Sequence, residues 1–158
     1  MQLATMSPLF QRIGPRAFDE MRTLTFSGHP VIPDGTYGLL EFYCEKPGCD
    51  CRRVVLHVVR EDTGLKSWAS INFGWEPEAF YVQWMSGNAK AAEGMAGASL
   101  DTLNPQTEHA PAFFAVVEDG VLTDADYVAR LRRHYAEFKA ACSRPAPGSM
   151  TSRKQRRQ

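Results

Sequence analysis

The sequence lacks any run of eighteen apolar residues, and it lacks the motifs of several well-known enzyme classes. Without such a run, no segment is predicted to cross a membrane as a helix. No GxSxG, P-loop, GxGxxG or HExxH motif is present, and the HxE…PCxxC arrangement of the zinc deaminases is also missing. These absences count against those enzyme classes and leave the general question of catalysis open.

Net charge is absent as well, but the charges are unevenly distributed. The 158 residues include 18 basic and 18 acidic side chains, and the length suits one domain. Residues 143–158 hold five basic residues and no acid. We therefore expect one α+β domain over 1–142 and a basic, disordered tail over 143–158. The tail could bind nucleic acid or a protein through Arg153, Lys154, Arg156 and Arg157.

The N-terminal segment lacks the pattern of a secretory signal. Residues 1–13 have neither a charged first region nor a continuous apolar stretch. Nothing in them directs export, so the reducing cytoplasm is the expected compartment. In that compartment, clustered cysteines are more often metal ligands or redox groups than structural disulfides.

What is present predicts an antiparallel sheet of about four strands, packed by C-terminal helices. Strands are expected where β-branched and aromatic residues gather, at 36–44, 53–60, 67–73 and 79–85. Helices are expected at 16–24, 89–96 and 111–118. A further helix is expected to begin at Thr123 as its N-cap and to end near Cys142. Its apolar positions have spacings of three and four residues, as in Val128, Leu131, Tyr135, Phe138 and Cys142.

The most distinctive chemistry is a C-x4-C-x-C cluster made by Cys44, Cys49 and Cys51. It lies between the strands predicted at 36–44 and 53–60. The four residues 46–49 read Lys-Pro-Gly-Cys, and Pro followed by Gly suits the two central positions of a type II turn. Such a turn folds Cys49 back towards Cys44 at the tip of a hairpin. Three thiolates could then occupy three corners of a zinc tetrahedron.

The fourth zinc ligand must come from outside the tip, or be water. His29 can return from a preceding loop and is the best histidine. His57 lies six residues beyond Cys51, about 20 Å away along a straight strand. Cys142 and Asp50 are alternatives, although Cys142 also fits a buried helical stripe. The spacing departs from the C-x4-C-x2-C of plant-type ferredoxins, so zinc is favoured over an iron–sulfur centre.

Two other interpretations of the cluster stay open. It could serve a thiol-redox or zinc-dependent enzyme, with Cys49 or Cys51 activated beside Arg52. Alternatively, the cysteines could be simple buried apolar side chains, which three residues at a turn fit poorly. The polar stretch 99–109 could line a site, but a capped connection between helices is favoured because no mechanism-bearing spacing occurs in it.

The string YCEKPGCDCRRV, together with AGASLDTLNPQ, resembles a group of uncharacterised bacterial proteins. These proteins share a YCxxPxCDCRRV core and an AGASLDxLNPQ segment. The resemblance covers about residues 35–140. It implies a shared architecture and assigns no activity.

Overall fold

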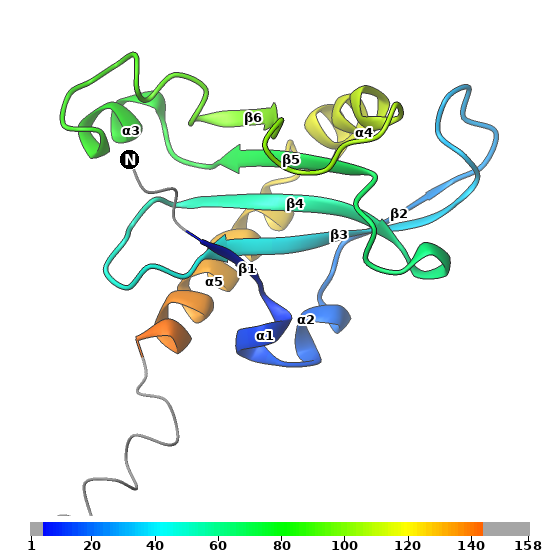
Figure 1. Ribbon diagram of the computed structural model, residues 1–158, viewed down its shortest axis with the longest axis horizontal. Helices are drawn as coiled ribbons and strands as arrows, with labels where there is room; N and C mark the ends of the chain where they lie inside the picture. The colour runs from blue at the N-terminus through cyan, green and yellow to red at the C-terminus, as the bar shows by residue number, and fades with distance from the viewer. Residues whose placement is uncertain (1–4, 144–158) are drawn as a thin grey trace, which may run out of the picture.

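The computed structural model describes residues 5–143, which form an antiparallel sheet with helices against it (Figure 1). The strands are β1 (Met6–Pro8), β2 (Thr23–Phe26), β3 (Gly35–Cys44), β4 (Arg53–Arg60), β5 (Ala69–Gly74) and β6 (Gly97–Leu100). The α-helices are α1 (Phe10–Ile13), α2 (Arg16–Asp19), α3 (Glu78–Trp84), α4 (Ala110–Val116) and α5 (Ala125–Cys142). A 3₁₀ turn, η1 (Glu61–Thr63), follows β4, and a π-helical turn, η2 (Val117–Val121), extends α4. The predicted tail residues Arg153, Lys154, Arg156 and Arg157 lie outside the described residues.

The order of strands in the sheet is β1-β3-β4-β5-β6, and β2 also pairs with β3. The ten-residue strand β3 is long enough to hold both short strands along one edge. Pro8 of β1 lies opposite Phe42 near one end of β3, whereas Thr23 of β2 lies opposite Gly38 near the other. Every pairing is antiparallel. The α+β prediction is confirmed, but the sheet has six strands rather than four.

One face of the sheet carries the main core. Side chains alternate along a strand, so Tyr37, Leu39 and Tyr43 of β3 point to the same side, and all three are fully buried. Helices α4 and α5 cover this side, and α5 crosses behind the sheet in Figure 1. Phe113 of α4 packs against Tyr37 with ring centroids 4.8 Å apart. The predicted packing of C-terminal helices on the sheet is therefore confirmed.

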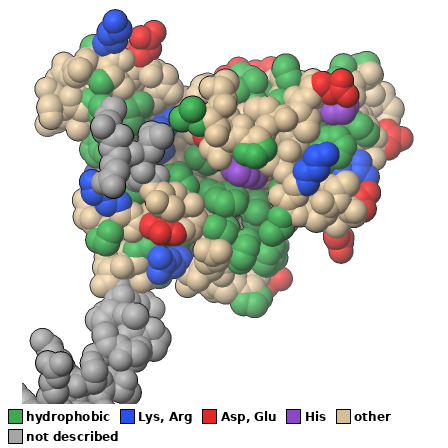
Figure 2. All heavy atoms as spheres, in the orientation of Figure 1, with side chains coloured by type: hydrophobic (Ala, Val, Ile, Leu, Met, Phe, Trp, Pro, Cys, Tyr) green, Lys and Arg blue, Asp and Glu red, His purple; other side chains and the backbone are tan. Residues whose placement is uncertain are grey.

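The opposite face of β3 and β4 looks towards the viewer in Figure 2, where hydrophobic side chains surround a histidine. The pairing register places Leu40 beside His57 and Phe42 beside Val55 on this face. His57 stacks on Phe42 with ring centroids 4.2 Å apart. Burial lowers the pKa of His57, which is consistent with an imidazole packed as an apolar ring.

Helix α5 matches the helix predicted from apolar spacing, with one change at its start. Asp124, not Thr123, is the N-cap, and its carboxylate accepts a hydrogen bond of 3.0 Å from the backbone N–H of Asp126. An Asp at this position satisfies a free N–H and also suits the positive end of the helix. The predicted stripe is largely correct, since Leu131, Tyr135 and Phe138 are buried.

The buried stripe also contains a titratable polar residue that apolar spacing does not reveal. His134 is fully buried on α5, with Nδ1 2.8 Å from Glu41 Oε1 and Nε2 2.8 Å from Glu20 Oε2. Glu41 points from the middle of β3, and Glu20 directly follows α2. The imidazole therefore connects α5 to both the sheet and the N-terminal helices.

Some local predictions were wrong. Residues 79–85 form helix α3 rather than a strand, and 89–96 form consecutive turns rather than a helix. Pro77, which precedes α3 as its N-cap, and Glu78 in the first turn are helix-start signals that the aromatic, β-forming composition obscured. The helix expected over 16–24 ends at Asp19, and the chain then enters β2.

Candidate metal centre

The cysteine cluster is held by a turn at the junction of β3 and β4. Cys44 is the last residue of β3, while Cys49 and Cys51 lie in the connection to β4. The backbone N–H of Cys49 donates to the carbonyl of Lys46 over 3.2 Å, and Gly48 has φ +75°. These are the features of the predicted type II turn, in which the third residue needs a positive φ.

The three sulfur atoms converge. All three Sγ atoms lie within 4.8 Å of one another. Sulfur atoms at two corners of a zinc tetrahedron with 2.3 Å bonds are about 3.8 Å apart. The sulfurs therefore need to move by about 1 Å or less to share one ion. The three cysteines can hold a metal ion, as the sequence predicted.

Burial differs among the three cysteines. Cys44 and Cys51 are buried, with 1% and 8% of their surface exposed, and Cys49 is half-buried. Burial, together with the neighbouring sulfurs, raises the pKa of Cys49 and raises the pKa of Cys51 to about 12. Without a metal, the Cys49 and Cys51 thiols are therefore protonated at neutral pH. A bound cation would replace these protons, because only thiolates act as ligands.

Helix α5 supports the tip from below. The Lys139 ammonium donates to the carbonyls of Cys44 (3.0 Å) and Lys46 (2.9 Å). The Tyr135 hydroxyl donates to Asp50 Oδ1 over 3.1 Å and accepts from the backbone N–H of Arg52 over 3.3 Å. Three of these contacts fix the backbone on both sides of the turn, and the fourth holds the Asp50 carboxylate. Tyr135 and Lys139 lie one helical turn apart on α5, and together they hold the turn that carries the three sulfur atoms.

Arg52, directly after Cys51, also contacts the residues around the tip. Its backbone is in a left-handed conformation, with φ +47°. Its guanidinium contacts the carboxylates of Asp50 at 2.9 Å and Glu76 at 3.5 Å. It also lies over the Phe80 ring, 4.4 Å from the centroid. The Tyr81 hydroxyl donates to the Arg52 carbonyl over 2.8 Å. Arg52 is therefore a paired, structural cation.

The structure does not bring His29 to the cluster. His29 lies between β2 and β3, and its Nδ1 accepts from the backbone N–H groups of Val31 (3.1 Å) and Ile32 (2.9 Å). This connection leads into Gly35, nine residues from Cys44 at the far end of β3, which is about 30 Å of strand. The expectation that His29 completes the site assumed a returning loop. Because Phe26 of β2 pairs with Gly35 of β3, the loop that carries His29 lies at the Gly35 end of β3, away from Cys44.

The other suggested ligands are also outside the sulfur group. Asp50 has its carboxylate occupied by Arg52 and Tyr135. Cys142, half-buried at the end of α5, packs against the core and does not join the three sulfurs. His57 stacks on Phe42, on the face of the sheet opposite α5. Among the described residues, the site therefore consists of three cysteines.

Sequence reasoning missed Tyr135 and Lys139 as supports of the site. Tyr135 was expected only as part of the apolar stripe, and Lys139 was not singled out. Their spacing of four residues puts both on one face. Nothing in the sequence indicates that this face meets the cysteine turn, because that contact joins segments more than eighty residues apart.

The polar stretch 99–109 proves to be structural. The Gln106 side chain accepts from the Ser70 N–H (3.0 Å) and donates to the carbonyls of Ser70 (2.9 Å) and Asp101 (2.6 Å). Strand β6 ends opposite Ile71, so the Gln106 amide takes the place of a neighbouring strand for the backbone groups of Ser70. Thr107 Oγ1 donates to the Trp68 carbonyl one step further along. The stretch is a capped connection, as the sequence favoured, but it joins strand β6 to helix α4 and not two helices.

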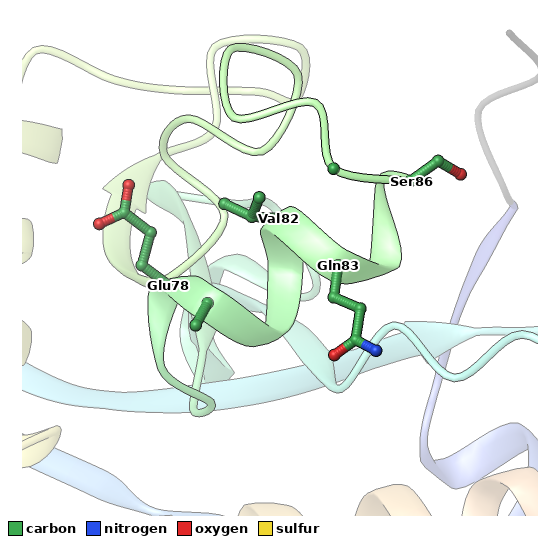
Figure 3. Close-up of a pocket in the computed structure, with 6 residues that line it drawn as sticks. Glu78, Val82, Gln83 and Ser86 are labelled. Carbon is green, nitrogen blue, oxygen red and sulfur yellow. The ribbon is translucent and has the colours of Figure 1, made fainter.

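A pocket on α3 does not supply an alternative site. It is lined by Glu78, Ala79, Val82, Gln83, Ser86 and Gly87. In Figure 3 the side chains of Glu78, Gln83 and Ser86 point in different directions. Groups that act together on a substrate must converge on it. We therefore assign the chemistry of the described residues to the cysteine cluster.

Comparison of the chain with models of protein families, with curated proteins and with solved structures gave no match. Among residues 5–143, no helix has the length and apolar character needed to span a bilayer.

Proposed function

We propose that this chain is a cytoplasmic zinc-binding domain in which Cys44, Cys49 and Cys51 hold the ion as thiolates. The proposal depends on one observation, the convergence of the three sulfurs within 4.8 Å. All four cysteines of the chain are free thiols, as a site in a reducing compartment requires. Thiolate ligands select soft or borderline cations, and zinc is the commonest of these in small structural sites.

The proposed role of the ion is structural. The cluster joins the end of β3 to the start of β4, the two central strands of the sheet. An ion shared by the two sides would hold this junction closed. The three sulfur atoms are not held close together in the unfolded chain, so the ion would bind the folded state. The free energy of zinc binding would therefore add to the free energy of unfolding. At a free zinc concentration one hundred times Kd, this stabilises the fold by about 2.7 kcal/mol.

The thiol-redox alternative is less well supported. A reactive cysteine needs a thiol pKa below the free value of about 8.5. Burial shifts the pKa of Cys49 and Cys51 upwards instead. Arg52, the cation suggested to activate them, is already paired with Asp50 and Glu76. Buried thiols with a raised pKa are poor nucleophiles, but they can still bind a metal ion by releasing their protons to solvent. Metal binding is therefore the better supported role for these cysteines.

The test is zinc stoichiometry in matched cysteine variants. Protein purified without metal and then titrated with zinc should bind one ion per chain and unfold at a higher temperature. Cys49→Ser should lose this response, because serine is a poor zinc ligand; Cys49 is half-buried, so the fold should tolerate the change. Cys142→Ser, also half-buried but outside the sulfur group, should retain it. Wild-type protein that binds no zinc, or is equally stable without it, contradicts the proposal.

A further inference from the structure

The part of the chain that the structure describes supplies three ligands to the proposed metal site and no fourth. Within residues 5–143, no other Cys, His, Asp or Glu side chain joins the three sulfurs. Residues 1–4 and 144–158 contain none of these four residue types in the sequence. A tetrahedral zinc site closed by the protein itself would need one of them. The coordination sphere therefore requires a ligand from outside the chain.

The cluster is accessible on one side. Lys46, Pro47 and Gly48 are exposed, and Cys49 is half-buried beside them. A Cβ built on Gly48 would meet no atom within 4 Å. The opposite side is closed, because Cys44 and Cys51 are buried and α5 contacts the Cys44 carbonyl through Lys139 and the Arg52 N–H through Tyr135. As far as residues 5–143 define the surface, an external ligand can therefore approach from the side of Cys49.

The charges at the site favour an anion as this ligand. A divalent cation with three thiolates has a net charge of −1. Two half-buried cations lie close by, Lys139 at the carbonyl of Cys44 and Arg53 next to Cys51. Neither makes an ion pair with a carboxylate in the part of the chain that the structure describes, and Arg53 donates only to the Met95 carbonyl (3.2 Å). One further anion would bring the site close to neutrality, which a partly buried site favours.

We propose that the fourth coordination position of this metal centre is open and binds a small anionic ligand from solvent, with low-molecular-weight thiolates as the preferred class. A thiolate matches both the soft donor set and the two unpaired cations. The inference rests on the proposed metal site. It changes the character of that site, since three protein ligands with one exchangeable position are the arrangement of a zinc centre that binds or activates small molecules.

The experiment uses the full chain loaded with cobalt(II) in place of zinc and titrated with 2-mercaptoethanol. Cobalt in a three-thiolate site should give visible absorption bands, and a fourth thiolate should shift them and raise the sulfur-to-cobalt charge-transfer absorption in a saturable way. Imidazole, a neutral ligand, should shift the bands differently. Cys142→Ser should respond as the wild type does.

Substitution of Lys139 separates the charge argument from simple access. Lys139→Met loses the contacts that Lys139 makes with the turn, which affects both ligands, but it should weaken binding of 2-mercaptoethanol about fivefold more than binding of imidazole, as expected for loss of one nearby charge in a half-exposed setting. Lys139→Arg should restore thiolate binding. Lys90→Met, which removes an exposed lysine elsewhere, is the control and should have no effect.

Each other outcome overturns a defined claim. If cobalt binds but its spectrum does not respond to 2-mercaptoethanol, the fourth position is already filled and the inference is wrong; a dimer in light scattering would then indicate a ligand from a second copy. Equal losses for thiolate and imidazole in Lys139→Met would refute the role of charge. Failure of cobalt and zinc to bind at all would overturn the proposed function together with this inference.

Discussion

At the scale of single residues, the buried hydroxyl groups of this fold differ in whether they have a partner. The Tyr43 hydroxyl donates to Glu41 Oε1 over 2.5 Å, whereas the equally buried Tyr127 hydroxyl has no hydrogen-bond partner among the described residues. We expect Tyr43→Phe to destabilise the fold by about 1.5–3 kcal/mol, because it leaves a buried carboxylate with one bond fewer. Tyr127→Phe should be neutral or stabilising. Urea unfolding of both variants measures this difference, and equal effects would contradict it.

Gln106 makes a second residue-scale prediction. Its amide satisfies three backbone groups at the end of β6, so Gln106→Ala should cost about 2 kcal/mol by leaving backbone groups of Ser70 without a partner. Gln83, whose side chain makes no hydrogen bond in the described part of the chain, provides the control. Gln83→Ala should change stability by less than about 0.5 kcal/mol. Hydrogen exchange at the Ser70 amide should rise only in the Gln106 variant.

At the scale of elements, β5 ends where the chain around α3 approaches very closely. A Cβ on Gly74 would lie 2.1 Å from the Met95 carbonyl oxygen and 2.5 Å from the Tyr81 hydroxyl. Because a backbone atom cannot move aside as a flexible side chain can, Gly74→Ala should destabilise by about 1–3 kcal/mol. It should also weaken zinc binding, since Tyr81 holds the Arg52 carbonyl beside the cluster.

Gly120 supplies the matched control for this prediction. It lies in η2, and a Cβ there would meet nothing within 4 Å. Gly120→Ala should be neutral or should stabilise by up to about 1 kcal/mol, through the lower entropy of the unfolded chain. Thermal unfolding with and without zinc would test both variants. Destabilisation by Gly120→Ala comparable to that of Gly74→Ala would show that close packing at β5 is not the cause.

At the scale of the whole molecule, the contact of α5 with the sheet should make stability depend on pH. Burial lowers the pKa of His134, but its bonds with Glu41 and Glu20 outweigh burial and raise the pKa above 6.5. The hydrogen bond from His134 lowers the pKa of Glu20 below 4.5. The histidine contribution is complete below pH 6.5 and is lost as pH rises through the raised pKa. The glutamate contribution is complete above pH 4.5 and is lost on acidification through the lowered pKa.

Both contributions are therefore complete between about pH 4.5 and 6.5, and the free energy of unfolding should decline on either side of that window. His134→Gln keeps a hydrogen-bonding side chain but removes the titration, so it should lose the decline on the alkaline side. If this variant does not fold, the ring signals of His134 in wild-type NMR spectra give the same information. A folded-state pKa at or below 6.5 would contradict the argument.

The extent to which sequence predicted this molecule follows the range of the interactions. The hairpin of β3 and β4 was predicted closely because alternating β-formers and a Pro-Gly turn act within about twenty-five residues. Apolar spacing likewise placed α5 to within two residues at its start. The strands β1, β2 and β6 were missed because each has at most four residues and depends on pairing with a longer strand.

The candidate site divides in the same way. The sequence determined that three sulfurs meet, since the turn that gathers Cys44, Cys49 and Cys51 is local. Only the tertiary structure decided what surrounds them. It placed His29 at the far end of β3 and set Tyr135 and Lys139 against the turn from more than eighty residues away. Local turn chemistry can bring ligands together, whereas the support and accessible side of the cluster depend on how distant elements pack.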